Sequence, residues 1–224
     1  SAGDVLEHYF QQGHPGRAAF YLNPTNPALL DDYSLVEPSV AAPLFPATAH
    51  NACGDERRAI SAYLNRRGDI DIIGMPKKRF RHPLVQRVYS KLRPTEYLRG
   101  RPYIERIIRS RFGIGVSAFQ NVKYYTSDRL THFLTFGKLY LAYRFPGCDE
   151  LFRDGVELCY YEGSEELGRK IDQFMRNREL AAEIGAAGQR KMVSEYNAQK
   201  MVKMMLEIID TGRSDAYPWT EVYA

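Results

Sequence analysis

The chain has 224 residues, 44% of them hydrophobic and 26% charged, which is close to the composition of an average soluble globular protein and excludes wholesale disorder. Its formal net charge of +4 suits an anionic ligand but falls short of the strong basic balance of nucleic-acid-binding proteins. The sequence contains no apolar run of about 18 residues and no secretion signal at its start.

Three cysteines, Cys53, Cys148 and Cys159, lie far apart, without a CxxC pair or a histidine at metal-ligand spacing. This pattern predicts reduced thiols in a reducing compartment, rather than a disulfide framework or a zinc site. We therefore expect a cytoplasmic protein without a bound metal. A peripheral contact with the inner face of a membrane stays open.

Residues 1–50 contain closely spaced prolines and glycines, which exclude a long helix because each proline removes a backbone donor. We expect an irregular lead-in, or a remnant of an upstream domain, with one strand near residues 42–45. A regular, Rossmann-like domain is expected at residues 51–212. The tail at residues 213–224 holds the only tryptophan and is expected to be docked or frayed.

Residues 55–74 predict a helix, a tight turn at Gly68 and a strand at residues 70–73. Gly74 follows at the carboxyl end of this strand, where parallel α/β sheets bind ligands. The next loop carries a basic cluster of Lys77, Lys78 and Arg79.

Residues 83–111 mix many arginines with aromatic residues, while the spacing of Ile104, Ile107 and Ile108 predicts an amphipathic helix. Three interpretations remain open for the basic residues. They form a solvated helix face, which the spacing favours, or a site for a diphosphate or other anionic ligand, or a surface that binds nucleic acid.

Residues 112–119 predict a strand, whose two glycines allow either a close approach to a ligand or close packing against a helix. A polar loop of Thr126, Ser127 and Asp128 then leads into a short helix that begins near Arg129. The free N–H groups and dipole of a helix N-terminus favour negative charge, so the sequence predicts a phosphate site here.

Residues 139–161 predict a strand, a turn at Gly147, an acidic short helix that contains Glu150, and a second strand. Three helices follow up to about residue 211, the first with Ser164 as its expected N-cap. Alternating strands and helices predict an α/β fold, a Rossmann-like parallel sheet covered by helices on both faces.

Three stretches carry a resemblance to a known family: RLTHFLTFGKLYLAY at residues 129–143, FPGCDELFRDGVELCYY at 145–161, and SEELGRKIDQFMRNRELAAEIGAAGQRKMVSEYN at 164–197. In this order they resemble the C-terminal, nucleotide-sugar-binding half of GT-B glycosyltransferases. They are most similar to the group-1 enzymes and their spore-coat CgeB-like branch. The resemblance covers roughly residues 55–210.

The resemblance implies a glycosyltransferase of the hexosyltransferase type, or its donor-binding domain, that uses a nucleoside-diphosphate sugar. The acceptor would be a cell-surface polysaccharide, a lipid-linked glycan or a protein. The donor would bind without a metal ion at ten residues: Gly74, Lys77, Lys78, Arg79, Thr126, Ser127, Asp128, Arg129, Gly147 and Glu150.

The chain departs from the family's pattern in two respects. The two glutamates that the retaining group-1 enzymes carry eight residues apart are replaced by Tyr124 and His132. His132 is our candidate for a catalytic acid or base, with a structural histidine as the alternative. An acceptor half is not visible, so an upstream domain or a partner chain would supply it.

Two further hypotheses remain. The chain is either a degenerate, non-catalytic GT-B module for the assembly or regulation of surface-glycan synthesis, or a fucosyltransferase-like GT-B enzyme, because YYTSDRLTHFLTFGK also resembles the donor motif of that family. Nucleic acid is the least favoured ligand.

Overall fold

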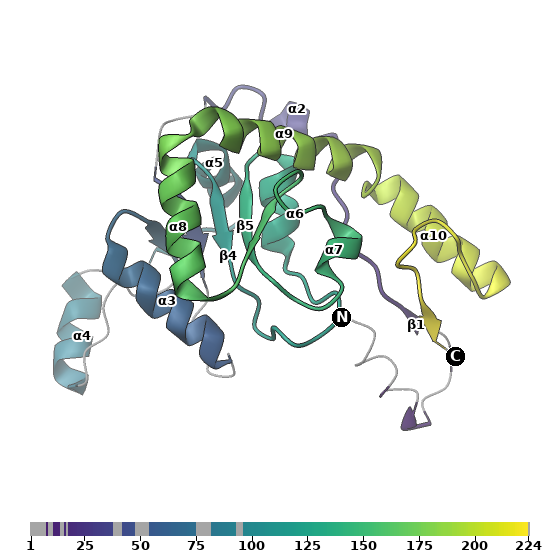
Figure 1. Cartoon of the computed structure of the whole chain (residues 1–224), viewed down its shortest axis with the longest axis horizontal. Helices are drawn as coiled ribbons and strands as arrows, with labels where there is room; N and C mark the ends of the chain where they lie inside the picture. The colour runs from purple at the N-terminus through teal and green to yellow at the C-terminus, as the bar shows by residue number, and fades with distance from the viewer. Residues whose placement is uncertain are drawn as a thin grey trace.

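The core of the fold is a five-stranded parallel sheet with helices on both faces (Figure 1). The computed structural model describes residues 8, 11–13, 16, 18–37, 42–47, 54–74, 82–92 and 96–223. Its strands run in the order β3-β2-β4-β5-β6. Their bounds are β2 (Leu44–Pro46), β3 (Asp71–Ile73), β4 (Gly113–Gly115), β5 (Tyr140–Tyr143) and β6 (Cys159–Tyr161).

Alternation along the strands divides the apolar core between the two faces of the sheet. In β5, Tyr140 and Ala142 belong to one buried cluster, whereas Leu141 belongs to the other. The same alternation separates Tyr160 from its neighbours in β6. Successive side chains of a strand point to opposite faces, so this near-continuous apolar run is what a sheet covered on both sides requires.

The helices are divided between these clusters. The first cluster includes residues of α5 (Arg101–Arg109) and α6 (Asp128–Thr135), and the second includes residues of α3 (Asp55–Arg67) and α8 (Gly163–Arg176). Helix α9 (Arg178–Ser194) contributes to both, and Figure 1 shows it crossing one end of the sheet. The remaining described helices are α2 (Leu29–Asp32), α4 (Pro83–Leu92), α7 (Cys148–Leu151) and α10 (Ala198–Thr211).

The glycines of β4 serve close packing. A Cβ atom on Gly113 would lie 2.5 Å from the Phe133 ring of α6, and one on Gly115 would lie 1.6 Å from the Tyr140 hydroxyl oxygen. Both contacts are far shorter than van der Waals contact, so helix α6 and strand β5 need glycine at these positions. Of the two interpretations of these glycines, the structure supports packing.

A segment near the start of the chain lies beside a segment near its end. Strand β1 (Ala18–Ala19) pairs antiparallel with β7 (Val222–Tyr223). Phe20 packs between Tyr124 and Trp219, with ring centroids 5.1 Å and 5.3 Å away. Trp219 is 1% exposed, so the tail is docked.

The predicted order of strands and helices is confirmed from residue 42 onward, with corrected boundaries. Ser164 is not the N-cap of α8, because the helix begins at Gly163 after Glu162, whose backbone N–H donates to Glu166 (2.7 Å). The strand expected near residues 42–45 is β2, which lies inside the sheet. The division of the chain into domains stays a prediction.

Cys148 and Cys159 are buried free thiols, and burial raises the pKa of Cys159 to about 11. Cys53 lies outside the described residues. None of the helices in the described part of the chain combines the length and apolar character that crossing a membrane requires.

Candidate functional site

The candidate site lies at the carboxyl edge of the sheet, where the strand order reverses between β2 and β4. Chain order along the sheet is second, first, third, fourth, fifth, and such a reversal opens a crevice in which α/β folds bind ligands. Helices α3 and α6 both begin at this edge. The N–H of Gly54, the N-cap of α3, donates to the carbonyl of Ala118 beyond β4 (3.3 Å).

Helix α6 begins with free backbone donors. Ser127 is its N-cap, with extended backbone angles and no capping bond from its side chain. The N–H groups of Asp128 and Arg129 have no hydrogen-bond partner among the described residues. The helix start therefore keeps the features that favour an anion.

Arg129 fixes this helix start to the sheet. Its Nη1 donates to the carbonyl oxygen of Pro46, the last residue of β2 (2.6 Å), and its Nε donates to Ser127 Oγ (3.2 Å). These bonds hold the guanidinium at the carboxyl end of β2. They use two of its five N–H groups.

A second arginine, Arg57, reaches the same edge from the first turn of α3. It is 5% exposed, and its charge, like that of Arg129, acts on the buried Tyr140 hydroxyl. Burial raises the pKa of Tyr140, while the two positive charges and a hydrogen bond with Ser127 oppose this rise. Both positive charges therefore act on the Tyr140 hydroxyl.

Sequence reasoning missed Arg57, although a signal was present. Arg57 stands three residues before Ile60 and seven before Leu64, on the same buried stripe of α3. A charge on an apolar helix stripe is buried, and a buried charge requires a partner or a function.

Thr126 and Ser127 lie with Tyr140 and Tyr143 around a cavity of about 10 Å³ beside the start of α6. The Tyr161 hydroxyl donates to the Gly115 carbonyl beneath it (3.0 Å). The predicted residues Thr126, Ser127, Asp128 and Arg129 thus lie at the helix start, beside the side chains of Tyr140 and Tyr143.

Gly74 lies at the carboxyl end of β3, at the same edge. Its φ is +79°, and a Cβ atom there would lie 1.8 Å from the Ala47 carbonyl oxygen. Its N–H donates to the Glu96 carbonyl (2.8 Å). Gly74 lets the ends of β2 and β3 approach, and the predicted basic residues Lys77, Lys78 and Arg79 lie outside the described residues.

Gly147 and Glu150 surround Tyr124 instead of standing with the residues of α6. Tyr124 has φ 58°, which is rare for a residue other than glycine, and its buried ring would overlap a Cβ atom on Gly147. Its hydroxyl donates to Glu150 Oε2 (2.5 Å). Burial, and then the bond to Glu150, raise the pKa of Tyr124 to about 12.

His132 lies one turn into α6. Its ring makes an edge contact with Tyr103 of α5 (centroids 5.7 Å apart), and its buried Nδ1 has no hydrogen-bond partner among the described residues. Burial lowers the pKa of His132 below its usual value, although the charge of Asp128 opposes the shift. Burial therefore favours the neutral ring, and its Nδ1 is available to a ligand.

An acidic hollow of about 580 Å³ adjoins this edge on the side of α3. It is lined by side chains that include Glu56, Gln120, Asn121, Tyr143 and Glu162. Arg144, also in the lining, contacts the carboxylates of Asp149 (2.8 Å), Asp154 (3.1 Å) and Glu162 (3.4 Å). Because carboxylates surround its cation, the hollow disfavours a phosphate.

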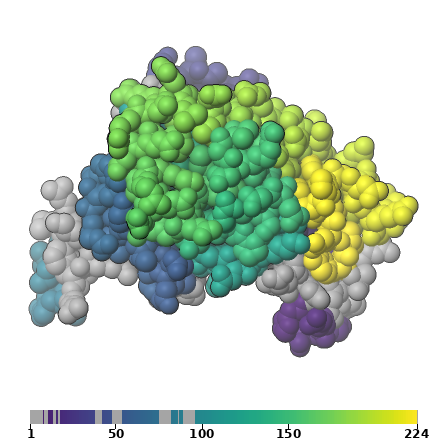
Figure 2. Space-filling view, in the orientation of Figure 1, coloured from purple at the N-terminus to yellow at the C-terminus, as the bar shows by residue number. Residues whose placement is uncertain are grey.

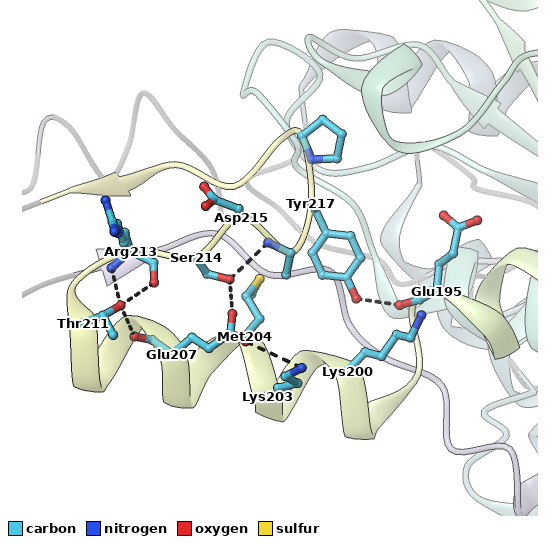
Figure 3. Close-up of a pocket in the computed structure, with 12 residues that line it drawn as sticks. Glu195, Lys200, Lys203, Met204, Glu207, Thr211, Arg213, Ser214, Asp215 and Tyr217 are labelled. Atoms are coloured by element: carbon cyan, nitrogen blue, oxygen red, sulfur yellow. Dashed lines mark hydrogen bonds and ion pairs between the residues drawn. The ribbon is translucent and has the colours of Figure 1, made fainter.

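A second pocket, of about 760 Å³, lies between α10 and the tail (Figure 3). Several of its polar groups satisfy one another. Ser214 Oγ contacts Glu207 Oε2 (2.6 Å), and the Tyr217 hydroxyl donates to the Glu195 carbonyl (2.5 Å). With three basic and three acidic residues in its lining, this pocket has no charge preference.

In the described part of the chain no three or more His, Cys, Asp or Glu residues are grouped so that they could hold a metal ion. Metal-free donor binding stays a prediction. Apart from the Asp128 carboxylate, the polar groups at the start of α6 are the Arg129 cation, backbone donors and hydroxyls, which suit a phosphate-bearing ligand.

The fold is that of a Rossmann-like α/β domain and matches glycosyltransferases of the GT-B type. Residues 57–207 match the family described as Glycosyl transferase-like, and the chain belongs to this family. A search of the curated protein sequences found no match.

Solved glycosyltransferases share the fold. Sucrose-phosphate synthase from Thermosynechococcus elongatus superposes with a TM-score of 0.60 at 12% identity, over 93% of this chain and 56% of that one. A glycosyltransferase from Rickettsia africae gives 0.55 at 18% identity, over 81% and 50%. Anabaena Alr3699/HepE, solved with UDP and glucose, gives 0.55 at 14% identity, over 84% and 54%. The chain thus spans about half the length of these structures.

Proposed function

We propose that the chain binds the nucleoside-diphosphate sugar donor of a glycosyltransferase at the carboxyl edge between β2 and β4. The observation that carries this proposal is Arg129, held at the carboxyl end of β2, together with the N–H groups of Asp128 and Arg129, which have no hydrogen-bond partner among the described residues. Arg57, in the first turn of α3, adds a second positive charge that acts on Tyr140. A diphosphate carries negative charge at this point in the bound donor, and more develops there as the glycosidic bond to the sugar breaks.

The two arginines would stabilise the departing diphosphate electrostatically. They are held before the donor arrives, Arg129 by Pro46 and Arg57 by burial, so little reorganisation opposes charge development. Lys77, Lys78 and Arg79 follow β3 in the sequence and would add to the positive charge. His132, with its unused Nδ1, would accept a hydrogen bond from a hydroxyl group of the substrate.

The acidic hollow would hold a sugar. Carboxylates accept hydrogen bonds from hydroxyls and repel phosphate, and Asn and Gln side chains both donate and accept. A donor with its diphosphate between the arginines would direct its neutral end away from them, toward Glu56 and Tyr143. The acceptor would be a polysaccharide, a lipid-linked glycan or a protein, and a second domain or chain would bind it.

A non-catalytic module is the second candidate, and Tyr124 favours it. Tyrosine has no carboxylate, and the Tyr124 hydroxyl is bound to Glu150 on a buried ring, so Tyr124 does not replace the glutamate expected at this position. Such a module would bind the nucleotide without transferring the sugar.

A thermal-shift panel tests donor binding. We expect UDP, GDP or one of their sugars to raise the Tm, because a ligand that binds only the folded state stabilises it. At a concentration 100 times its Kd, the stabilisation is about 2.7 kcal/mol. A folded sample that no nucleotide stabilises would refute the proposal. Binding without transfer, in the presence of the full set of partner domains, would favour the non-catalytic module.

A further inference from the structure

The segment at residues 20–25 lies along one side of helix α6. The Thr131 hydroxyl of α6 donates to the carbonyl oxygen of Asn23 (2.8 Å), and the Thr135 hydroxyl donates to the Thr25 hydroxyl (2.7 Å). Figure 1 shows the segment passing behind α7 between β1 and α2, and Figure 2 shows the same face in space-filling form. A stretch far from α6 in the sequence is therefore attached to the helix whose start forms the proposed donor site.

The segment is fixed to the rest of the fold on both sides of Asn23. Leu22 is fully buried. The N–H of Thr25 donates to the carbonyl oxygen of Tyr196 (2.9 Å), and the N–H of Ala198 donates to the carbonyl oxygen of Thr25 (2.9 Å). Asn23 therefore faces α6 from a defined position.

The Asn23 side chain binds the acidic residue at the start of α6. Its Nδ2 donates to Oδ1 of Asp128, the first residue of the helix. Positions 128, 131 and 135 fall within an arc of about 60° on an α-helix, so this bond continues the row made by the two threonines. The Arg129 side chain instead reaches the end of β2. The carboxylate and the guanidinium of neighbouring residues are thus held by different parts of the chain.

The Asp128 carboxylate has two opposing effects on this helix start. It stabilises the helix, because an acidic side chain in the first turn interacts favourably with the helix dipole. It also repels a phosphate and, when not held elsewhere, competes with it for the unpaired N–H groups of the same turn. In the structure the N–H groups of Asp128 and Arg129 have no partner among the described residues, and the carboxylate accepts a hydrogen bond from Asn23.

We propose that Asn23 is a positioning residue of the donor site. It holds the Asp128 carboxylate on the side of α6 that faces residues 20–25, so that the N–H groups of the first turn and Arg129 stay open to the diphosphate. The inference rests on the proposed function, because it assigns Asn23 a role in diphosphate binding. Asn23 acts through Asp128 and does not touch the ligand.

Isothermal titration calorimetry of Asn23→Ala with UDP or GDP, whichever raises the Tm more, tests the proposal. One unit charge at about 6 Å from a phosphate, with an effective dielectric constant of about 40 to 80, changes the affinity roughly three- to tenfold. We therefore expect the Kd of Asn23→Ala to rise by this factor. Asn23→Asp keeps the shape of the side chain but turns the donor into a second carboxylate, so its Kd should rise at least as much.

A double variant separates this role from a merely structural one. When Asp128→Asn has removed the charge, the further change Asn23→Ala should leave the Kd unchanged, because no carboxylate remains to be held. Thr131→Val is the matched control: it removes the other bond between α6 and Asn23, keeps the amide, and should bind like the wild type. Urea unfolding shows that each variant is folded.

The outcomes distinguish this inference from the proposed function. Wild-type affinity in folded Asn23→Ala or Asn23→Asp would overturn the role of Asn23 while the wild type still binds its nucleotide. The same loss from Asn23→Ala with and without Asp128→Asn, or an equal loss in Thr131→Val, would overturn it too. A folded wild type that binds neither UDP nor GDP would overturn both proposals.

Discussion

Replacing Arg57, the buried arginine of the proposed diphosphate site, tests whether this residue binds the diphosphate. The change Arg57→Met keeps an apolar stem in the helix stripe and removes the charge. At about 4 to 6 Å from a phosphate, with an effective dielectric constant of about 20, one unit charge contributes roughly 3 to 4 kcal/mol. Desolvation of the cation offsets part of this, so we expect a net loss of about 2 to 3 kcal/mol, or roughly 30- to 150-fold in Kd.

The assay is isothermal titration calorimetry with the nucleotide that raises the Tm most in the thermal-shift panel. Arg66→Met is the matched control, because Arg66 is an exposed residue in the last turn of the same helix, at the end away from the site. Urea unfolding of the apo proteins separates binding from folding. Equal Kd values for folded Arg57→Met and the wild type would refute the assignment of Arg57 to the diphosphate.

Four further predictions follow from the geometry. In urea unfolding, Gly74→Ala should destabilise the fold by at least about 2 kcal/mol more than Gly68→Ala. Both glycines have φ +79°, but only at Gly74 would the added Cβ atom meet a carbonyl oxygen, that of Ala47. Equal losses of stability in the two variants would contradict this. Tyr124→Phe should cost about 1 kcal/mol by removing the bond to Glu150, and an unchanged midpoint would show that the bond contributes nothing. Glu56→Gln should weaken binding of the nucleotide sugar but leave the Kd of the nucleoside diphosphate unchanged. Equal effects on both Kd values would refute the assignment of the sugar to the acidic hollow. The pKa of His132 is lowered in the folded chain, so its contribution to stability is complete above about pH 6.5 and is lost as the pH falls through the folded value. Between pH 7.5 and pH 5, a His132→Phe variant should therefore lose less free energy of unfolding than the wild type. Identical pH dependence of the free energy of unfolding in the two proteins would refute this.

The order of strands and helices was predictable because each element carries its own signal. Gly68 ends α3 in a left-handed conformation, and the apolar run of β5 lies between Gly137 and Pro146. Local periodicity of apolar residues is sufficient to predict such elements, since the apolar residues that set the periodicity are also the ones that become buried. Strand β2 was placed within about two residues on the same grounds.

The candidate site was only partly predictable. The start of α6 could be read from Thr126 to Arg129, but Arg57 was missed. Its burial depends on where α3 packs, which the local sequence does not specify. The left-handed backbone of Tyr124 depends likewise on contacts with Gly147 and Glu150, more than 20 residues away.

The pairing of β1 with β7 joins residues about 200 positions apart through two short strands. So small a ladder has little stability of its own, and it should open in local fluctuations well before the sheet unfolds. Trp219, the only tryptophan, is buried in the aromatic cluster that this closure completes. Its fluorescence should therefore change at lower denaturant concentration than the circular dichroism of the helices, so the protein contains its own optical reporter for detachment of its two ends.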